Sequence, residues 1–257
     1  MGIILYYKKG IISIKTKCDK VEKSDSKKTK KLHYDLTENY FKEISKNKMG
    51  YYDAKNVQKL KHTSQQYKIW QICISFLDSI LKTNKKIEKI ADIGCGIGDF
   101  TIDIANRYSN FNKIVGVDFL DEVIDLAEKN EKKYKKVTFV KENLLDLSFQ
   151  DRSFDITLCI NVIHHIYSKD LNKAINELAR ITDKYLIIEI RNKKNIFNFW
   201  YKYFSLPILY KKLPVYSSSI DELNKILNKE KFELKRVKGI YANTRICWRL
   251  LLMYKKV

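Results

Sequence analysis

The sequence is short of glycine and proline for its 257 residues, and it contains no long apolar run. Its five cysteines are odd in number, scattered and without a CxxC pair, which argues against a disulfide framework or a zinc site and fits a reducing cytosol. No stretch of about 18 apolar residues is present, so no segment reaches the usual length of a membrane span. The opening residues also lack the pattern of a secretory signal peptide. We therefore expect a cytoplasmic protein without a bound metal.

Acidic residues are too few to balance the basic ones, because 30 Asp and Glu face 50 Lys and Arg, for a formal net charge of +20. Such a charge can attract nucleic acid, acidic lipid or phosphate. It can also reflect a lysine-rich composition, since the chain is rich in Ile and Asn as well. No RNA-binding motif accompanies the charge, so we do not expect nucleic acid as the main partner.

Apolar residues make up 45% of the chain, which is enough for a full core in one large domain or at most two small ones. Residues 1–32 are lysine- and serine-rich at their end and predict a flexible basic tail. Residues 33–86 predict a helical cap, whose longer helix over 65–82 has apolar residues every three or four positions. Residues 87–257 form the predicted main domain.

Strand-like and helical patterns alternate through the main domain. Strands are predicted at 87–93, 113–119, 137–142, 154–160 and 184–190, and helices at 100–108, 121–130 and from an N-cap at Asp170 to Ile181. Near-continuous apolar strands separated by helices indicate an α/β fold with a parallel sheet covered on both faces. Further on, Ser219 and Glu222 predict a capping box, and two last strand-like stretches predict an antiparallel pair that closes the sheet.

Three glycines stand at alternate positions directly after the first predicted strand, in IADIGCGIGDFT at residues 90–101. Glycine weakens ordinary strands and helices, so these glycines indicate a sharp turn and a close approach to bare backbone. Between a strand and a helix, such a loop and the helix N-terminus can meet a ligand at the carboxyl edge of the sheet.

The next predicted strand ends in Asp118, an acid suited to accept hydrogen bonds from both hydroxyls of a ribose. The alternative is that Asp118 only caps the helix that follows. The glycine loop and the acid together favour the ribose interpretation.

The alternating glycines differ from the GxGxxG pattern of nicotinamide enzymes. The stretch ADIGCGIGDFTIDIA instead resembles the first motif of class I S-adenosylmethionine-dependent methyltransferases. The resemblance continues through VGVDFLDEVIDLAEKN, VTFVKENLLDLSFQDRSFDITLCINVIHHI and NELARIT, and it is closest to the small-molecule and quinone-type group. It implies a Rossmann-like sheet of seven strands, mostly parallel with an antiparallel last strand, and S-adenosyl-L-methionine as cofactor.

The resemblance also implies which residues bind that cofactor. Asp92 and the loop from Gly94 to Gly98 would surround its amino-acid end, Asp118 would hold its ribose, and Phe119 would lie against its adenine. Asn143 stands where the family commonly has an adenine-contacting Asp. The complete implied set is Asp92, Gly94, Cys95, Gly96, Gly98, Asp118, Phe119, Asn143, Leu144, Cys159 and Asn161.

Two histidines, His164 and His165, follow the fourth predicted strand, where the resemblance places the acceptor pocket. A base is needed only if the acceptor keeps a proton at neutral pH, and histidine titrates in the suitable range. We predict that His165 acts as that base or orients the acceptor. The alternative is that both histidines only pack or line a loop.

An insertion at residues 192–216 combines many aromatic residues with flanking lysines. It could be a lid over an apolar acceptor, or a patch at 193–212 that collects a lipid-soluble acceptor from an acidic membrane. It could also be a helix whose aromatic side chains are buried against the cap.

The sequence as a whole predicts a methyltransferase that acts on a small, aromatic or lipidic acceptor through oxygen or carbon. A second hypothesis is RNA methylation, which the charge favours. A third is a cofactor-binding scaffold or regulator without catalysis. The predicted location is the cytoplasm, with peripheral membrane contact if the lysine-flanked insertion meets lipid.

Overall fold

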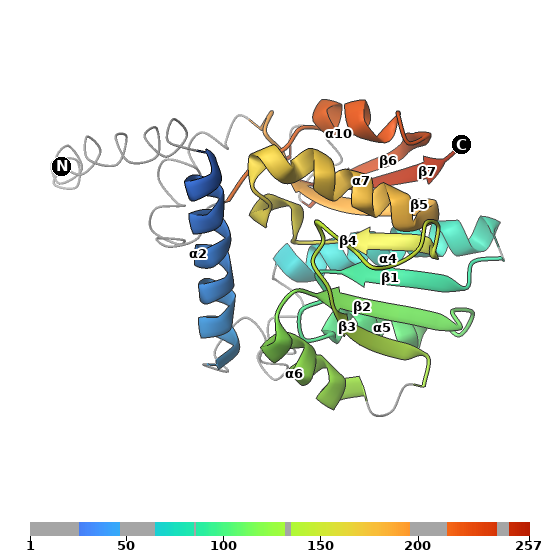
Figure 1. The fold of residues 1–257 in the computed structure, drawn as a ribbon. Coiled ribbons are helices and arrows are strands. Elements are labelled where there is room, and N and C mark those ends of the chain that lie inside the picture. Colours follow the sequence, from blue (N-terminus) through green and yellow to red (C-terminus); the bar gives the residue numbers. More distant parts are fainter. Residues whose placement is uncertain (1–25, 47–64, 85, 132–134, 196–214, 241–246) are drawn as a thin grey trace, which may run out of the picture.

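A seven-stranded sheet with the order β3-β2-β1-β4-β5-β7-β6 forms the centre of the computed structural model (Figure 1). The structure describes residues 26–46, 65–84, 86–131, 135–195, 215–240 and 247–257. The strands are β1 (Lys89–Ile93), β2 (Lys113–Asp118), β3 (Val137–Lys141), β4 (Phe154–Cys159), β5 (Thr182–Arg191), β6 (Phe232–Gly239) and β7 (Arg249–Lys256). β7 pairs antiparallel with both β5 and β6, while the pairs among β1 to β5 are parallel. The predicted mostly parallel sheet with a reversed last strand is confirmed.

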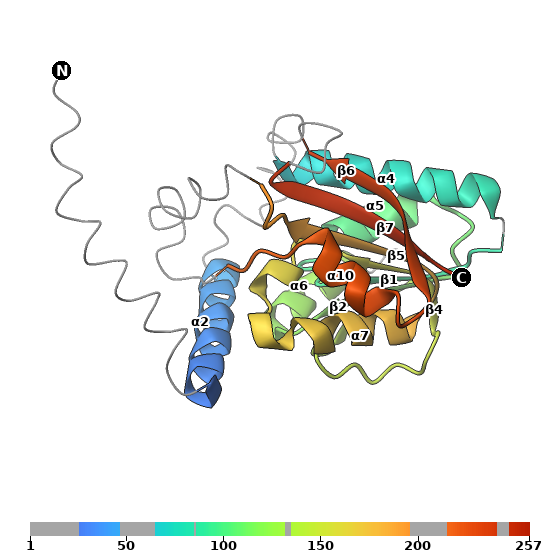
Figure 2. The ribbon, with the colours of Figure 1, turned by 90° about the horizontal axis from the view of Figure 1, so that it is seen from above.

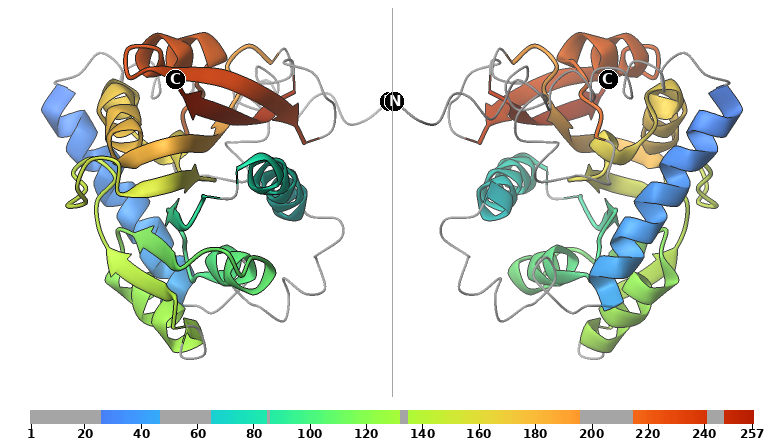
Figure 3. Two further views of the ribbon diagram at one scale, coloured as in Figure 1. Left: turned by 90° about the vertical axis from the view of Figure 1, so that its right-hand side faces the viewer. Right: turned by 90° about the vertical axis from the view of Figure 1, so that its left-hand side faces the viewer.

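Helices cover both faces of this sheet (Figure 2). The α-helices of the described residues are α2 (Ser26–Lys46), α4 (Gln65–Thr83), α5 (Asp99–Arg107), α6 (Asp121–Glu131), α7 (Leu171–Ile181) and α10 (Ile220–Leu227). α4 and α5 lie on one face, and α7 and α10 lie on the other, where they contact each other (Figures 2 and 3). The alternation of strands and helices predicted from residue 87 onward is therefore confirmed.

The core reaches from the sheet into α4. The strands β1, β2 and β4 are buried almost throughout, as expected for parallel strands covered on both faces. One face of α4, carrying Ile69, Phe76, Leu77 and Ile80, joins the same apolar cluster. Burial of each such side chain contributes about 1.5–3 kcal/mol, so α4 belongs to the packed layers around the sheet.

Two predicted helix caps behave differently. Ser219 and Glu222 form the predicted capping box at the start of α10, with the Ser219 side chain accepting from the Glu222 N–H and the Glu222 carboxylate accepting from the Ser219 N–H. Asp170 occupies the N-cap position of α7 as predicted, but its side chain makes no capping hydrogen bond. Its carboxylate instead accepts from Lys30 and Tyr34, both at 2.8 Å. The acid therefore joins two helices that are far apart in the sequence.

That second helix, α2, crosses the carboxyl ends of the parallel strands (Figures 1 and 3). It begins at Ser26, inside the segment predicted as a flexible tail. His33 and Thr37 are buried on the side of α2 that faces the sheet, while Leu32 and Leu36 are exposed. The aromatic insertion lies mostly outside the described residues, because the structure describes it only at 192–195 and 215–216.

Candidate functional site

The candidate site lies where the strand order changes direction, between β1 and β4. In open α/β sheets the crevice at such a switch point, outside the carboxyl ends of the strands, is the usual place for a ligand. The glycine loop follows β1, and Gly98 is the N-cap of α5. Asp118 ends β2 next to it, and Asn161 follows the end of β4. The fold therefore brings together the ends of three of the strands from which the sequence predicted cofactor-binding residues.

All three loop glycines have left-handed backbone angles, with φ values of 80° at Gly94, 57° at Gly96 and 82° at Gly98. A side chain is disfavoured there whatever the space. At two of them, a side chain would also collide with a neighbouring residue. A Cβ on Gly94 would lie 1.9 Å from Cγ2 of Val162, and a Cβ on Gly98 would lie 2.4 Å from the ring of Phe139. These two glycines thus let neighbouring elements pack against the loop.

Asp118 connects the glycine loop to the start of α6. Its carboxylate accepts hydrogen bonds from the backbone N–H groups of Gly96 at 3.1 Å, Phe119 at 2.8 Å and Leu120 at 3.3 Å. Burial raises the pKa of this carboxyl, and the three N–H donors oppose that rise. The contact with Gly96 goes beyond what helix capping alone would require. Because a carboxylate has about four acceptor positions, capacity remains for ribose hydroxyls.

Phe119 is one of the few large apolar side chains that the described residues expose, with 39% of its surface accessible. It directly follows Asp118 at the carboxyl edge of the sheet. An exposed aromatic ring next to a hydroxyl-accepting carboxylate suits a nucleoside, which offers a flat base beside a ribose. The two residues therefore fit the adenosine part of the implied cofactor.

Asp92 is a buried acid at the base of the glycine loop, with only 4% of its surface exposed. The Thr101 hydroxyl donates to it at 2.7 Å. Burial raises the pKa of Asp92 to about 6, the Thr101 hydrogen bond lowers it in part, and the nearby Asp118 raises it further. A cation at this position would favour the ionised carboxylate, so the α-ammonium group of an amino acid is a suitable ligand.

We expect Asp92 to make the protein less stable as the pH rises from about 4 to 6. The folded-state pKa of about 6 lies above the ordinary 3.8, so the protonated acid favours folding at low pH and this contribution is lost through pH 6. Relative to Asp92→Asn, wild-type protein should lose roughly 2–3 kcal/mol of unfolding free energy across this range. Urea unfolding at both pH values measures it. The control variant Asp103→Asn, at a partly exposed acid paired with Arg107, should follow the wild type. Parallel curves for wild type and Asp92→Asn would contradict the assignment.

The remaining implied cofactor residues differ in accessibility. Asn143 is exposed, and its Oδ1 accepts from the Leu145 N–H at 2.9 Å within a short turn. Leu144 and Cys159 are buried, and Cys95 is partly buried with its Sγ near the Gly96 carbonyl. Their roles stay predictions. Asn143 uses one acceptor position for the turn and keeps its amide group at the surface.

Asn161 belongs to a buried polar network that the sequence did not reveal. Its side chain contacts Gln66 and Arg249, and its N–H donates to the Glu189 carboxylate at 3.1 Å. Arg249 also donates from Nε to Glu189 at 2.8 Å. Burial alone would raise the pKa of Glu189, but the guanidinium groups of Arg249 and Arg191 hold it below its ordinary value. An ionised pair therefore lies beside the end of β4.

His164 and His165 form a short 3₁₀ turn, η1 (Ile163–His165), beside this network. Burial, Arg191 and His33 lower the pKa of His165 to about 3, and burial together with His165 and the two nearby arginines keeps the pKa of His164 well below 6.5. Both rings are neutral at pH 7, so the 3.8 Å approach of His164 to Glu189 is no ion pair. A pKa near 3 is far from the optimum for a base at neutral pH. The geometry favours the orienting role for His165, which stays a prediction.

Helix α2 closes over these histidines. Nε2 of His33 donates to the carbonyl oxygen of His165 at 2.7 Å, and Phe41 packs edge-on against the His165 ring. Among the described residues, the Nδ1 atoms of His33, His164 and His165 are buried without a hydrogen-bond partner. Buried polar atoms in native proteins usually have partners, so these nitrogens are available to a bound molecule or to water.

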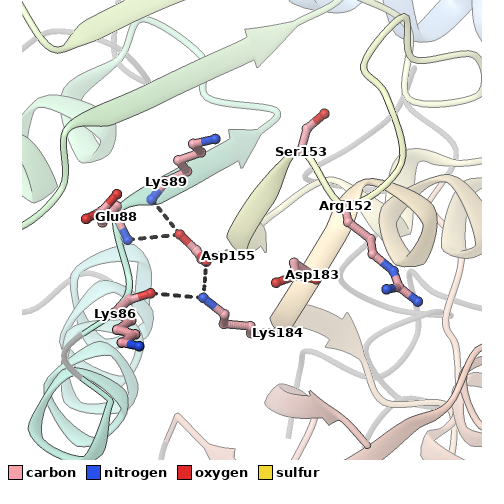
Figure 4. Close-up of a pocket in the computed structure, with 8 residues that line it drawn as sticks. All are labelled: Lys86, Glu88, Lys89, Arg152, Ser153, Asp155, Asp183 and Lys184. Atoms are coloured by element: carbon pink, nitrogen blue, oxygen red, sulfur yellow. Dashed lines mark hydrogen bonds and ion pairs between the residues drawn. The ribbon is translucent and has the colours of Figure 1, made fainter.

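A surface hollow at the opposite edge of the sheet is a poor candidate (Figure 4). It is lined by Lys86, Glu88, Lys89, Arg152, Ser153, Asp155, Asp183 and Lys184. Asp155 accepts from the Glu88 and Lys89 N–H groups, both at 2.9 Å, and pairs with Lys184. These charged groups compensate one another at the amino ends of the strands, whereas ligands of such folds bind at the carboxyl ends.

The described residues bring together no group of three His, Cys, Asp or Glu side chains that could hold a metal. None of the helices within the described ranges is long and apolar enough to cross a bilayer. The described cysteines, Cys73, Cys95, Cys159 and Cys247, are free.

Comparisons with known proteins find relatives among methyltransferases. Residues 90–184 match the sequence model of a methyltransferase domain family. The chain is 35% identical to an uncharacterised protein of Methanocaldococcus jannaschii over 53% of its own length and 60% of the relative's. It is 28% identical to a demethylmenaquinone methyltransferase of Bacillus licheniformis over 35% of its own length and 38% of the relative's. The chain thus spans less than two thirds of these relatives.

The fold itself extends further than the sequence similarity. The crystal structure of magnesium protoporphyrin IX methyltransferase from Synechocystis, with bound S-adenosylhomocysteine, covers 84% of this chain and all of that one, with a TM-score of 0.61 and 18% identity. At this identity the likeness shows the fold. The family resemblance predicted from the glycine loop is confirmed.

Proposed function

We propose that the protein, whose residues 90–184 match a methyltransferase domain family, is a class I S-adenosylmethionine-dependent methyltransferase that transfers a methyl group to a small, aromatic or lipid-like acceptor. The observation that carries the proposal is the Asp118 carboxylate, which is bonded to the Gly96 N–H of the glycine loop and followed by the exposed Phe119 ring. These groups fit a ribose and an adenine.

The chain's own residues would hold the cofactor along the carboxyl edge of β1, β2 and β4. Asp118 would accept hydrogen bonding from the ribose, Phe119 would lie against the base, and Asp92 in its ionised form would face the α-ammonium group. When bound, the cofactor would supply an electrophilic methyl group to an acceptor oxygen or carbon, with S-adenosylhomocysteine as the leaving group. An acceptor that keeps a proton at neutral pH would also need a base. Positioning and exclusion of water supply the rate in such a displacement.

An acceptor of the quinone or porphyrin kind is supported by the relatives, whose names include a demethylmenaquinone and a magnesium protoporphyrin methyltransferase. His33 and His165 line the side of the acceptor region that α2 covers. Neutral imidazoles can hydrogen-bond to a hydroxyl or carbonyl group without charge. Membrane contact through 193–212 stays a prediction, because residues 196–214 lie outside the described part of the chain. The described Lys193 and Lys194 pair with Glu222 and Asp221 of α10.

The proposal is tested by incubating the protein with radiolabelled S-adenosylmethionine and separate small-molecule, lipid and RNA fractions. We expect label in the small-molecule or lipid fraction, and only weak, unselective RNA binding that disappears near physiological salt. Label in one selected RNA at that salt would show that the acceptor is RNA and not a small molecule or lipid. Cofactor binding without transfer into any fraction would favour the non-catalytic hypothesis.

A further inference from the structure

Asn161 stands at the second position after β4 and has an unusual backbone conformation. Its φ of 63° is left-handed, which asparagine tolerates better than most residues. Its N–H donates to Glu189, its side-chain oxygen accepts from Arg249 and its side-chain nitrogen donates to Gln66. Three contacts from three separate elements therefore hold one strained residue.

Arg249 makes the central contact of this set. One guanidinium group donates from Nε to Glu189 and from Nη2 to Asn161, so it bridges the acid on β5 to the turn after β4. Glu189 is fully buried and Arg249 is 4% exposed. A buried ion pair is weak evidence for stability, because desolvation offsets much of the attraction. The planar fork of arginine is suited to fixing two acceptors at once, which points to a role in orientation.

The turn at Asn161 determines where the next residue lies, and Val162 presses on the glycine loop. A Cβ on Gly94 would lie 1.9 Å from the Val162 methyl group, so no side chain separates the two segments. A shift of the Asn161 turn would move Val162 against the backbone of Gly94. The loop after β4 and the glycine loop are therefore held as one unit.

We propose that Arg249 is a positioning residue for cofactor binding: it holds the Asn161 turn, and through Val162 it fixes the glycine loop. This role rests on the proposed function. The guanidinium group of Arg249 contacts Glu189, Asn161 and the Trp248 ring, so it reaches the glycine loop through Asn161. Its effect on the ligand passes through Asn161.

Two variants separate orientation from stability. Arg249→Lys keeps a cation for Glu189 but lacks the second arm for Asn161. Asn161→Gly keeps a residue that adopts a positive φ and removes both side-chain contacts. Arg236→Lys is the matched control, because Arg236 donates to Ser79 at 2.9 Å and stacks on Phe76 away from the glycine loop.

The measurement is the Kd of S-adenosylhomocysteine by calorimetry, together with Tm by thermal unfolding of each variant. We expect Arg249→Lys and Asn161→Gly each to raise Kd about tenfold, and the double variant to raise it about tenfold as well, because both changes break one connection. Arg236→Lys should lower Tm by about as much as Arg249→Lys does, but it should leave Kd unchanged.

The binding measurement distinguishes failure of the inference from failure of the proposed function. Wild-type protein that does not bind S-adenosylhomocysteine would overturn the proposed function and this inference with it. If the wild type binds, then single variants within twofold of its Kd would overturn the inference alone. A Kd raised about a hundredfold in the double variant would also overturn the inference, because the effects of independent contacts add.

Discussion

Replacement of Glu189 by alanine is expected to lower the unfolding free energy by about 3–5 kcal/mol. Glu189 is fully buried, and it accepts from Arg249 and from the Asn161 N–H. Without its carboxylate, the guanidinium group of Arg249 stays buried without the acid that accepts from its Nε, and a buried unpaired charge is costly. Such a loss is a large share of the 5–15 kcal/mol that an ordinary domain has. Urea unfolding at pH 7 measures it.

Two further variants define the cause. Glu233→Ala breaks an exposed pair with Lys235 and should cost less than about 1 kcal/mol. The double variant Glu189→Leu/Arg249→Met removes both charges and should recover most of the lost stability, because apolar replacements of a buried pair are often neutral. It should still bind S-adenosylhomocysteine poorly. A Glu189→Ala protein as stable as Glu233→Ala would show that the buried pair contributes no more to the unfolding free energy than an exposed one.

Replacement of Asp118 by alanine is expected to weaken S-adenosylhomocysteine binding by about a hundredfold or more. A hydrogen bond to a charged group contributes about 1.5–3 kcal/mol, and the variant would lose the bond that the remaining acceptor position makes to the ribose. It would also lose the bond from the Gly96 N–H that holds the loop. Calorimetry measures the change in Kd.

The matched control for this change is Asp103→Ala on α5, where the acid forms an exposed pair with Arg107. It should bind like wild type. Circular dichroism of Asp118→Ala should show folded protein, because the lost bonds lie at the carboxyl end of β2. Unchanged affinity in folded Asp118→Ala would mean that the ribose does not lie there.

The sheet and the glycine loop were predictable because their signals are local. Apolar runs of strand length identify β1, β2 and β4, and the alternating glycines follow β1 directly. The left-handed angles at Gly94, Gly96 and Gly98 are what that spacing requires. Asp118 was found in the same way, since it ends the neighbouring strand.

The buried network could not be predicted because its partners are distant in the sequence. Glu189 sits in an apolar strand as a single acid, and Arg249 looks like an ordinary basic residue near a strand end. Only the reversed strand β7 places Arg249 beside β5, 60 positions from Glu189. Asp170 shows the same limit: its position predicts a cap, while its partners Lys30 and Tyr34 come from α2.

The late position of Arg249 has a consequence for synthesis of the protein on the ribosome. Asn161 and Arg249 are 88 positions apart. At 5–20 residues per second, roughly 4–18 s pass between the translation of the two residues. During that interval β1 to β4 can pair, but the turn after β4 lacks the guanidinium group that orients it. A nascent chain would therefore acquire its nucleoside-binding edge only after β7 has emerged and joined the sheet between β5 and β6.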